Sequence, residues 1–172
     1  MAVVSYVSTE DAAEKVRALF EGMEKKKVAV PNVLRVMAHS PEMLEGFLAL
    51  NGTLSKTKLD GKLRELAYIK TSELNGCDYC LHHHRTYGRK GGLTERQVNE
   101  TDSFESSDAY DDLQRDVLRY AEEVTRHITV SDDLIDRLRQ RLSDREIVEL
   151  AMTVGIANFT NRVTQTLRME LP

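Results

Sequence analysis

Apolar side chains recur at intervals of three and four residues along most of this 172-residue chain. That spacing is typical of the buried face of an α-helix, whereas a half-buried strand alternates apolar and polar residues. No segment of convincing length shows the alternating pattern. Three prolines and nine glycines also leave little material for many tight turns. The pattern therefore predicts an all-helical fold.

Helix-boundary signals divide the chain into about seven or eight helices. Ser40-Pro41-Glu42 is typical of a helix start, with serine as the cap and proline at the first helical position. Asp60 predicts the cap of the next helix, and Asn75-Gly76 predicts its end because both residues tolerate left-handed backbone geometry. Pro31 is expected to break the pattern. Further caps are predicted at three places: Thr94 with Gln97, Ser131, and Ser143 with Glu146.

The chain has the size and composition of one ordinary globular domain. Apolar residues make up 41% of it and charged residues 30%, which suits a soluble protein with a real core. No internal repeat or linker divides the sequence, so we expect a single domain over residues 1–172. The polar, serine-rich segment from Glu100 to Asp108 is the best candidate for a mobile surface loop.

Charge and hydropathy exclude several classes of partner. The net charge of −4 provides no broad basic footprint for nucleic acid or anionic lipid. No run approaches the roughly 18 consecutive apolar residues that a membrane span needs. Residues 1–10 lack the basic start and apolar run of a secretory signal. We therefore expect a cytoplasmic protein with no nucleic-acid or membrane partner.

The two cysteines of the chain, Cys77 and Cys80, lie three residues apart. A single pair of cysteines this close in sequence cannot crosslink distant parts of a secreted fold, so a redox or metal role is expected. A new helix is predicted from Cys77 to about Arg89, and the positive end of a helix favours thiolate over thiol. His84 follows Cys80 by four residues and so lies on the same helical face, where an imidazole can exchange a proton with a thiol.

Helix arithmetic places a carboxylate beside this histidine. Glu65 lies eleven residues before Gly76, and His84 lies eight after it. A rise of about 1.5 Å per residue puts them roughly 16 and 12 Å from the turn, at similar depth if the two helices pack antiparallel. A carboxylate beside an imidazole fixes its tautomer and raises its basicity. We therefore predict a proton relay of Glu65, His84, Cys80 and Cys77 that ends in a redox-active pair.

A CxxC pair can also bind zinc or attach a haem. Zinc with Cys77, Cys80, His84 and Glu65 as ligands is an alternative, although structural zinc prefers more thiolates and no second CxxC or HxxxH pair exists. A c-type haem is excluded because Leu81, rather than histidine, follows the second cysteine. A thioredoxin-like fold is disfavoured because no strand precedes the motif. We expect no cofactor and no resident metal.

Several neighbouring residues are predicted to be structural. Tyr68 and Tyr79 are expected as core or rim aromatics. Of His82 and His83, at least one should face solvent. Three polar residues interrupt the apolar final helix and are expected in a buried polar network or a subunit contact: Asn158, Asn161 and Arg162.

At these residues the sequence resembles the carboxymuconolactone decarboxylase-like superfamily, and within it the alkylhydroperoxidase D-type proteins. The matching pattern is glutamate, eleven residues, CxxC, three residues, histidine. Three flanking segments match as well: Val30-Pro31-Asn32, Ser40-Pro41-Glu42 and Asn158 to Arg162. The resemblance implies an all-helical fold of the alkylhydroperoxidase D type and association into trimers or hexamers. It also implies a cysteine pair that reduces peroxides or serves as a thiol–disulfide carrier.

The resemblance implies a role for each motif residue, taken from the matching position of the family's motif. Cys80 would attack the peroxide after activation by His84, Cys77 would resolve the sulfenic acid into a disulfide, and Glu65 would complete the relay. The implied partners are a hydroperoxide or small disulfide and a thiol reductant. One departure is that Tyr79 stands where the best-known peroxidase members carry a histidine.

Two functions of other classes stay open. One is a non-enzymatic helical binding protein that holds a metal at the cysteines. The other is a decarboxylase-like enzyme acting on a small acid or lactone, although the decarboxylase members lack the cysteine pair. Apolar residues on more than one face of the last helix give mild support to a homo-oligomer: Leu150, Met152, Val154, Ile156, Phe159 and Val163.

Overall fold

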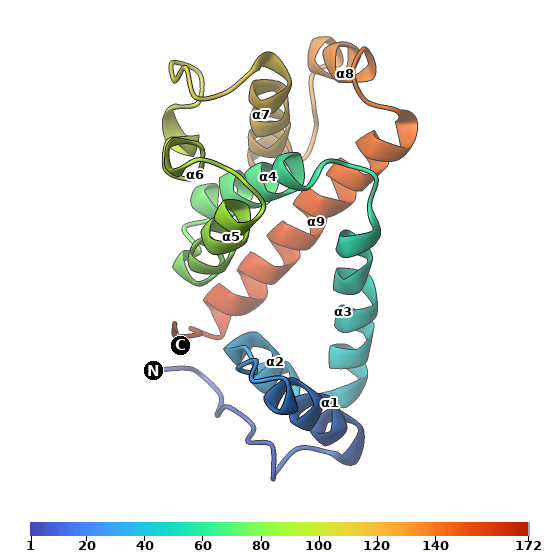
Figure 1. Cartoon of the computed structure of the whole chain (residues 1–172), viewed down its shortest axis with the longest axis vertical. Helices are drawn as coiled ribbons and strands as arrows, with labels where there is room; N and C mark the ends of the chain where they lie inside the picture. Colours follow the sequence, from blue (N-terminus) through green and yellow to red (C-terminus); the bar gives the residue numbers. More distant parts are fainter. Residues whose placement is uncertain (172) are drawn as a thin grey trace. The chain divides into compact units, whose positions relative to one another are not determined.

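The computed structural model describes residues 1–171, and over that range the chain forms nine α-helices, two short 3₁₀-helices and no strand (Figure 1). The predicted all-helical fold is confirmed. In chain order the elements are α1 (Glu14–Lys25), α2 (Asn32–Met37), α3 (Pro41–Thr53), η1 (Leu54–Lys56), α4 (Gly61–Leu74), α5 (Asp78–Lys90), α6 (Glu95–Asn99), η2 (Thr101–Ser103), α7 (Asp112–His127), α8 (Asp132–Arg139) and α9 (Asp144–Thr166).

The helix that the sequence did not predict is α2, which is only six residues long. Pro31 was expected to interrupt the helical pattern, but it occupies the N-cap of α2. Proline lacks a backbone N–H, and the first turn of a helix leaves that group without an intrahelical partner, so proline is tolerated there. Pro31 therefore starts a helix as well as ending the segment before it.

The chain divides into two compact units, one made of residues 1–53 with the residues from 164 onward and one of residues 54–163. The single domain expected from the sequence stays a prediction. In the first unit, Val3 N–H donates to the Leu167 carbonyl at 3.0 Å, which ties the start of the chain to its end. Its core is apolar and comes from α1 to α3 and the segments beside them: Ala12, Val16, Phe20, Val30, Leu34, Ala38 and Leu44.

In the second unit α4 packs against both α5 and α7. Every residue from 65 to 72 on α4 is buried. One core cluster joins α4 to α7, α8 and α9 through Leu63, Ala67, Val117, Ala121, Leu134, Leu138, Leu150 and Val154. A second cluster joins α4 to the α5–α7 region through Leu66, Ile69, Leu93, Val98, Phe104 and Leu118. The helix that carries Glu65 is therefore enclosed by apolar contacts on both sides.

Most of the predicted helix caps are present. Asp60 accepts a bond from the Lys62 N–H at 2.7 Å, and Thr94 with Gln97 forms a complete capping box. Ser143 and Glu146 bond each other's backbone N–H reciprocally. Ser131 is the exception, because it occupies the N-cap of α8 but makes no side-chain cap bond there. Its hydroxyl contacts a carboxylate oxygen of Glu123 at 3.3 Å instead.

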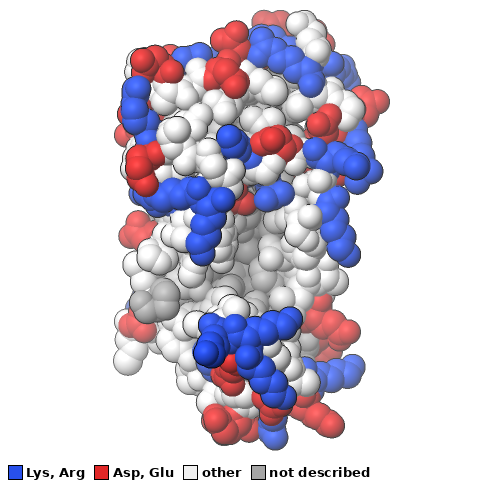
Figure 2. Space-filling view, in the orientation of Figure 1, with Lys and Arg blue, Asp and Glu red and all other residues white. Residues whose placement is uncertain are grey.

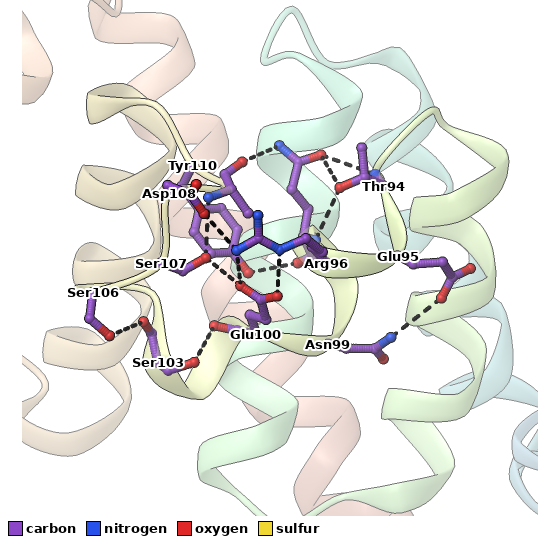
Figure 3. A network of polar contacts seen from close by, with 12 residues as sticks. Thr94, Glu95, Arg96, Asn99, Glu100, Ser103, Ser106, Ser107, Asp108 and Tyr110 are labelled. Carbon is purple, nitrogen blue, oxygen red and sulfur yellow. Dashed lines mark hydrogen bonds and ion pairs between the residues drawn. The ribbon is translucent and has the colours of Figure 1, made fainter.

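The serine-rich segment from 100 to 108 differs from the loose surface loop that was expected. Thr101 and Phe104 in it are buried. Arg96 forms ion pairs with both Glu100 and Asp108, and the Ser107 hydroxyl donates to the Glu100 carboxylate (Figure 3). The buried phenylalanine and these ion pairs anchor the segment to α6 and to the core.

Two surface properties bear on partners. Figure 2 shows basic and acidic side chains side by side on the face in view. Over residues 1–171, no helix combines the length and the apolar character that crossing a bilayer requires.

Candidate active site

The turn between α4 and α5 places the two cysteines. Gly76 adopts a left-handed backbone conformation with φ of +64°, which glycine reaches without steric cost. The Cys77 N–H then donates to the Ser72 carbonyl at 2.8 Å, and this bond closes the end of α4. Cys77 becomes the N-cap of α5, one residue before the first helical residue. The predicted start of this helix is therefore correct to within one residue.

Both cysteines are buried at the positive end of α5. The Cys77 sulfur accepts a bond from the Cys80 N–H at 3.4 Å, so it takes the position that a serine or aspartate oxygen usually holds in a cap. Backbone N–H groups and the helix dipole at this end favour negative charge on sulfur. The two predicted redox residues thus share one helix terminus.

Glu65 and His84 lie in direct contact. His84 Nδ1 lies 2.8 Å from Glu65 Oε2, which is the pairing that the helix arithmetic predicted. An ionised carboxylate can only accept, so Nδ1 carries the proton and the neutral ring keeps Nε2 as its acceptor. Glu65 is 8% exposed, and Arg64 Nε approaches its other oxygen at 3.4 Å. The pair can therefore take up a proton at Nε2 while its tautomer is fixed.

Tyr68 stacks on the His84 ring, a contact that the sequence did not predict. The ring centroids are 3.4 Å apart and the planes differ by 12°. Tyr87 meets the same imidazole edge-on at 5.5 Å and 86°. Each tyrosine lies three residues after one member of the Glu65–His84 pair, so each shares a helical face with it. That spacing places each tyrosine near the pair, but it does not determine how the rings stack.

The Tyr68 side chain is buried. Burial raises the pKa of Tyr68 far above its usual value, and the charges of Cys80, Glu65 and Cys77 raise it further. The hydroxyl therefore lies within electrostatic range of these three groups and stays protonated at neutral pH.

The hydroxyl also connects α4 to α9. It lies 2.5 Å from Thr160 Oγ1. The Thr160 hydroxyl is itself 3.0 Å from the backbone carbonyls of Ile156 and Ala157, which can only accept. Thr160 therefore donates to its own helix and accepts from Tyr68.

His82 and His83 have different environments. His82 is exposed, which confirms that at least one of the two faces solvent. His83 is half-buried against Tyr79, with ring centroids 4.7 Å apart, and burial lowers the pKa of His83. His83 Nε2 is buried and has no hydrogen-bond partner among residues 1–171. Neither ring joins the Glu65–His84 hydrogen bond.

An amide network holds the turn before Cys77 against α9. Asn75 Nδ2 donates to Asn158 Oδ1 at 3.1 Å and to Asn161 Oδ1 at 2.9 Å. Asn161 Nδ2 donates in turn to the Ser72 hydroxyl at 3.1 Å. Arg162 lies at the exposed side and donates to Asn158 Oδ1 at 2.6 Å. The expected polar network is confirmed, and it supports the turn on which the cysteines lie.

The four candidate zinc ligands do not converge on one point. Over residues 1–171, no three His, Cys, Asp or Glu side chains lie close enough together to hold a metal ion. Glu65 directs Oε2 to the imidazole of His84 instead.

A comparison with known families agrees with this geometry. The model of the carboxymuconolactone decarboxylase family matches residues 41–123, a range that includes Glu65, both cysteines and His84. The chain is thus similar to the carboxymuconolactone decarboxylase family over this range. The resemblance inferred from the motif is therefore confirmed, whereas the roles of the individual residues stay predictions.

Solved structures show the same fold. An uncharacterized peroxidase-related protein from Silicibacter sp. TM1040 is 28% identical, with a TM-score of 0.83 over 98% of this chain and 91% of its own. A peroxidase-related protein from Ralstonia eutropha JMP134, described as an alkylhydroperoxidase AhpD core, is 22% identical, with a TM-score of 0.84 over 99% and 92%. The debrominase Bmp8, solved also as a Cys→Ala variant with 2,3,4-tribromopyrrole, is 21% identical, with a TM-score of 0.85 over 100% and 92%. The chain has the alkylhydroperoxidase D-like fold.

Proposed function

We propose that this protein is a thiol-dependent peroxidase or disulfide reductase, in which Cys77 and Cys80 cycle between dithiol and disulfide. The observation that carries the proposal is the 2.8 Å hydrogen bond between Glu65 and His84 on the two helices that meet at the CxxC motif. A largely buried carboxylate–imidazole pair on the two helices that meet at two thiols is suited to proton transfer and thiolate chemistry.

In the first half of the cycle Cys80 is the attacking residue. His84 lies four residues beyond it on α5, and its Nε2 accepts the proton of the thiol while Glu65 stabilises the imidazolium. The thiolate attacks the terminal oxygen of the hydroperoxide and the O–O bond breaks. Cys80 becomes a sulfenic acid, and the departing alkoxide takes the proton from His84 to form an alcohol.

In the second half Cys77 resolves the sulfenic acid. Its sulfur attacks the sulfur of Cys80, hydroxide leaves with the Cys77 proton as water, and a disulfide forms. Two thiols and one hydroperoxide thus yield one disulfide, one alcohol and one water. An external dithiol then reduces the disulfide, and a small disulfide substrate would be reduced by the same thiols through exchange.

The test mixes the reduced protein with tert-butyl hydroperoxide and counts thiols before and after. We expect two thiols to be lost per chain, continuous turnover with a dithiol reductant, and no turnover in Cys77→Ser or Cys80→Ser. Retention of both thiols would refute the redox proposal. Catalysis of lactone or decarboxylation chemistry that survives both substitutions would favour the decarboxylase alternative, and one zinc per chain in native mass spectrometry would favour the binding protein.

A second substrate belongs in the same assay because Bmp8 shares the fold. A dithiol that supplies two electrons to an O–O bond can supply them to a C–Br bond, with the bromide leaving and a proton taking its place on carbon. Adding 2,3,4-tribromopyrrole to the reduced protein and measuring bromide release separates the two substrate classes. Bromide release without peroxide reduction would replace the peroxidase assignment by a dehalogenase one.

The proposal includes a homo-oligomer, with a trimer or hexamer favoured, and a reducing compartment such as the cytoplasm, which keeps thiols reduced. Val148, Met152 and Phe159 on α9 are 60%, 46% and 44% exposed, and their spacing places them on one face. Exposed apolar side chains aligned in this way suit a subunit contact. Light scattering after size exclusion tests this, because a mass of 19.6 kDa would exclude the oligomer.

A further inference from the structure

The Glu65–His84 hydrogen bond does not by itself orient the imidazole. One hydrogen bond fixes one ring atom and leaves the ring plane free to tilt about that contact. Proton exchange with a sulfur requires Nε2, on the opposite side of the ring, to point to a defined place. A displacement of about 1 Å at such a site can cost about 100-fold in rate. Something else must therefore fix the plane of the ring.

We infer that Tyr68 is a positioning residue, which holds the His84 imidazole in the plane that the thiol chemistry requires. The inference rests on the proposed function, because the plane matters only if His84 exchanges a proton with Cys80. The nearly parallel stacking at 3.4 Å resists tilting on one side of the ring. Tyr87, edge-on at 5.5 Å, bounds the imidazole from a second direction.

Tyr68 is itself held firmly. Its side chain is 3% exposed, and its hydroxyl is bonded to Thr160 on α9. A phenol ring that is packed along its length and bonded at its tip has little freedom to move with the imidazole. Tyr68 therefore serves as a fixed surface against which His84 is placed.

The stacking also discriminates between the two charge states of His84. The face of a phenol ring carries negative quadrupole charge and attracts a cation above it. An imidazolium stacked on Tyr68 is therefore favoured over the neutral ring, and so is the thiolate–imidazolium form of the site. Because the Tyr68 hydroxyl stays protonated, this effect comes from the ring and needs no charge on Tyr68.

The test uses the variants Tyr68→Leu, Tyr68→Met and Tyr68→Phe, with Tyr120→Leu as the matched control. Tyr120 is 6% exposed in the core between α4 and α7–α9 and has the same side chain. The readout is the rate of alkylation of Cys80 by iodoacetamide between pH 5 and 9 in a Cys77→Ser background. This readout needs no peroxide, and a loss of packing alone does not shift its pH dependence.

We expect Tyr68→Leu and Tyr68→Met to move the midpoint of the alkylation profile upward by about half a pH unit. In the otherwise unchanged chain, the same variants should lower peroxide turnover by about 100-fold with little change in KM. Tyr68→Phe keeps the ring and should leave the midpoint of the alkylation profile at the wild-type value. Methionine fills the site flexibly, so it preserves a measurable protein if the leucine variant fails to fold.

An alkylation midpoint in the folded Tyr68→Met variant equal to that of wild type and Tyr120→Leu would overturn the inference. So would a Tyr68→Phe variant that behaves like Tyr68→Met, because the hydroxyl rather than the ring would then be responsible. If wild-type protein reduces no peroxide, the proposed function fails, and the alkylation profiles still decide whether Tyr68 acts on His84.

Discussion

The Glu65–His84 pair differs from the surface network around Arg96 in how its charges are surrounded. Glu65 makes one short bond to one imidazole inside an aromatic enclosure. Arg96 contacts both Glu100 and Asp108 at 2.6 to 2.7 Å (Figure 3), and the three side chains are 30% to 86% exposed. The second region has more hydrogen bonds than the first, and its ion pairs are shorter. Exposed pairs are weakened by solvent and salt, whereas a buried charge depends strongly on its partner.

The difference shows that the number of polar contacts is a poor guide to function. The surface network of Arg96, Glu100 and Asp108 anchors a segment of chain, and water can take the place of any hydrogen-bond partner in it. Glu65 and His84 are largely shielded from water, so the proton on Nδ1 and the acceptor at Nε2 are defined by the protein alone. Substitutions should therefore separate the two regions cleanly, with activity lost in one and only stability altered in the other.

The strongest test of this contrast is His84→Ala. Removal of a general acid–base group costs about 10² to 10⁴-fold in rate, and we expect peroxide turnover to fall by that factor while the protein stays folded. His82→Ala is the matched control, because His82 is exposed on the same helix. Equal turnover in the two variants would remove His84 from the mechanism.

Glu65→Gln should have the next largest effect. Glutamine keeps the size of the side chain but carries no charge to stabilise the imidazolium, and loss of such an orienting partner typically costs about 10- to 100-fold. Turnover measured beside Glu95→Gln, a substitution in the surface ion pair with Arg89, provides the comparison. Matching losses in both would contradict the distinction between buried and exposed carboxylates.

Asn161→Ala should reduce stability more than any substitution in the surface network. Asn161 is fully buried and bonds both Asn75 and Ser72, so its removal leaves buried polar groups without that partner. We expect a loss of about 1–3 kcal/mol in the free energy of unfolding, measured in urea. The exposed Asn99→Ala is the control. A change in Asn161→Ala no larger than that of the control would show that the network does not support the turn.

Arg96→Gln should have the smallest effect, visible mainly through salt and pH. The Arg96 hydrogen bond holds the pKa of Glu100 and the pKa of Asp108 below their usual values. Carboxyl groups with lowered folded-state pKa values stabilise the fold above their unfolded pKa values, and this contribution is lost as pH falls. The Tm difference between Arg96→Gln and wild type should therefore be present at pH 7 and disappear near pH 2 or in high salt. A difference that persists there would mean that Arg96 acts through packing.

The sequence predicted most of the helices and the Glu65–His84 contact because both depend on local rules. Caps mark where the helices begin, and Asn75-Gly76 fixes the length of the turn, so residues eleven before and eight after Gly76 come to similar depth. The stacking of Tyr68 could not be predicted in the same way. It depends on how far α4 and α5 are rotated about their own axes, and the packing of α4 against α7 and α9 decides that rotation.

The same limit applies to the polar residues of α9. The residue types predicted a polar network. Its partners Asn75 and Ser72 come more than 80 residues earlier in the sequence, so only the packed structure brings them together. Pro31 shows the opposite case, because a proline that ends one segment can also begin a helix.

The unbroken burial of residues 65 to 72 on α4 has a consequence for motion. Amide hydrogens in a fully enclosed helix exchange with solvent only when a large cooperative unit opens. The carboxylate of the site belongs to that helix, whereas the two cysteines lie at the N-terminus of α5. The site therefore holds Glu65, the partner of the His84 imidazole, on a slowly exchanging helix, so that disulfide formation at the start of α5 can proceed without moving that carboxylate.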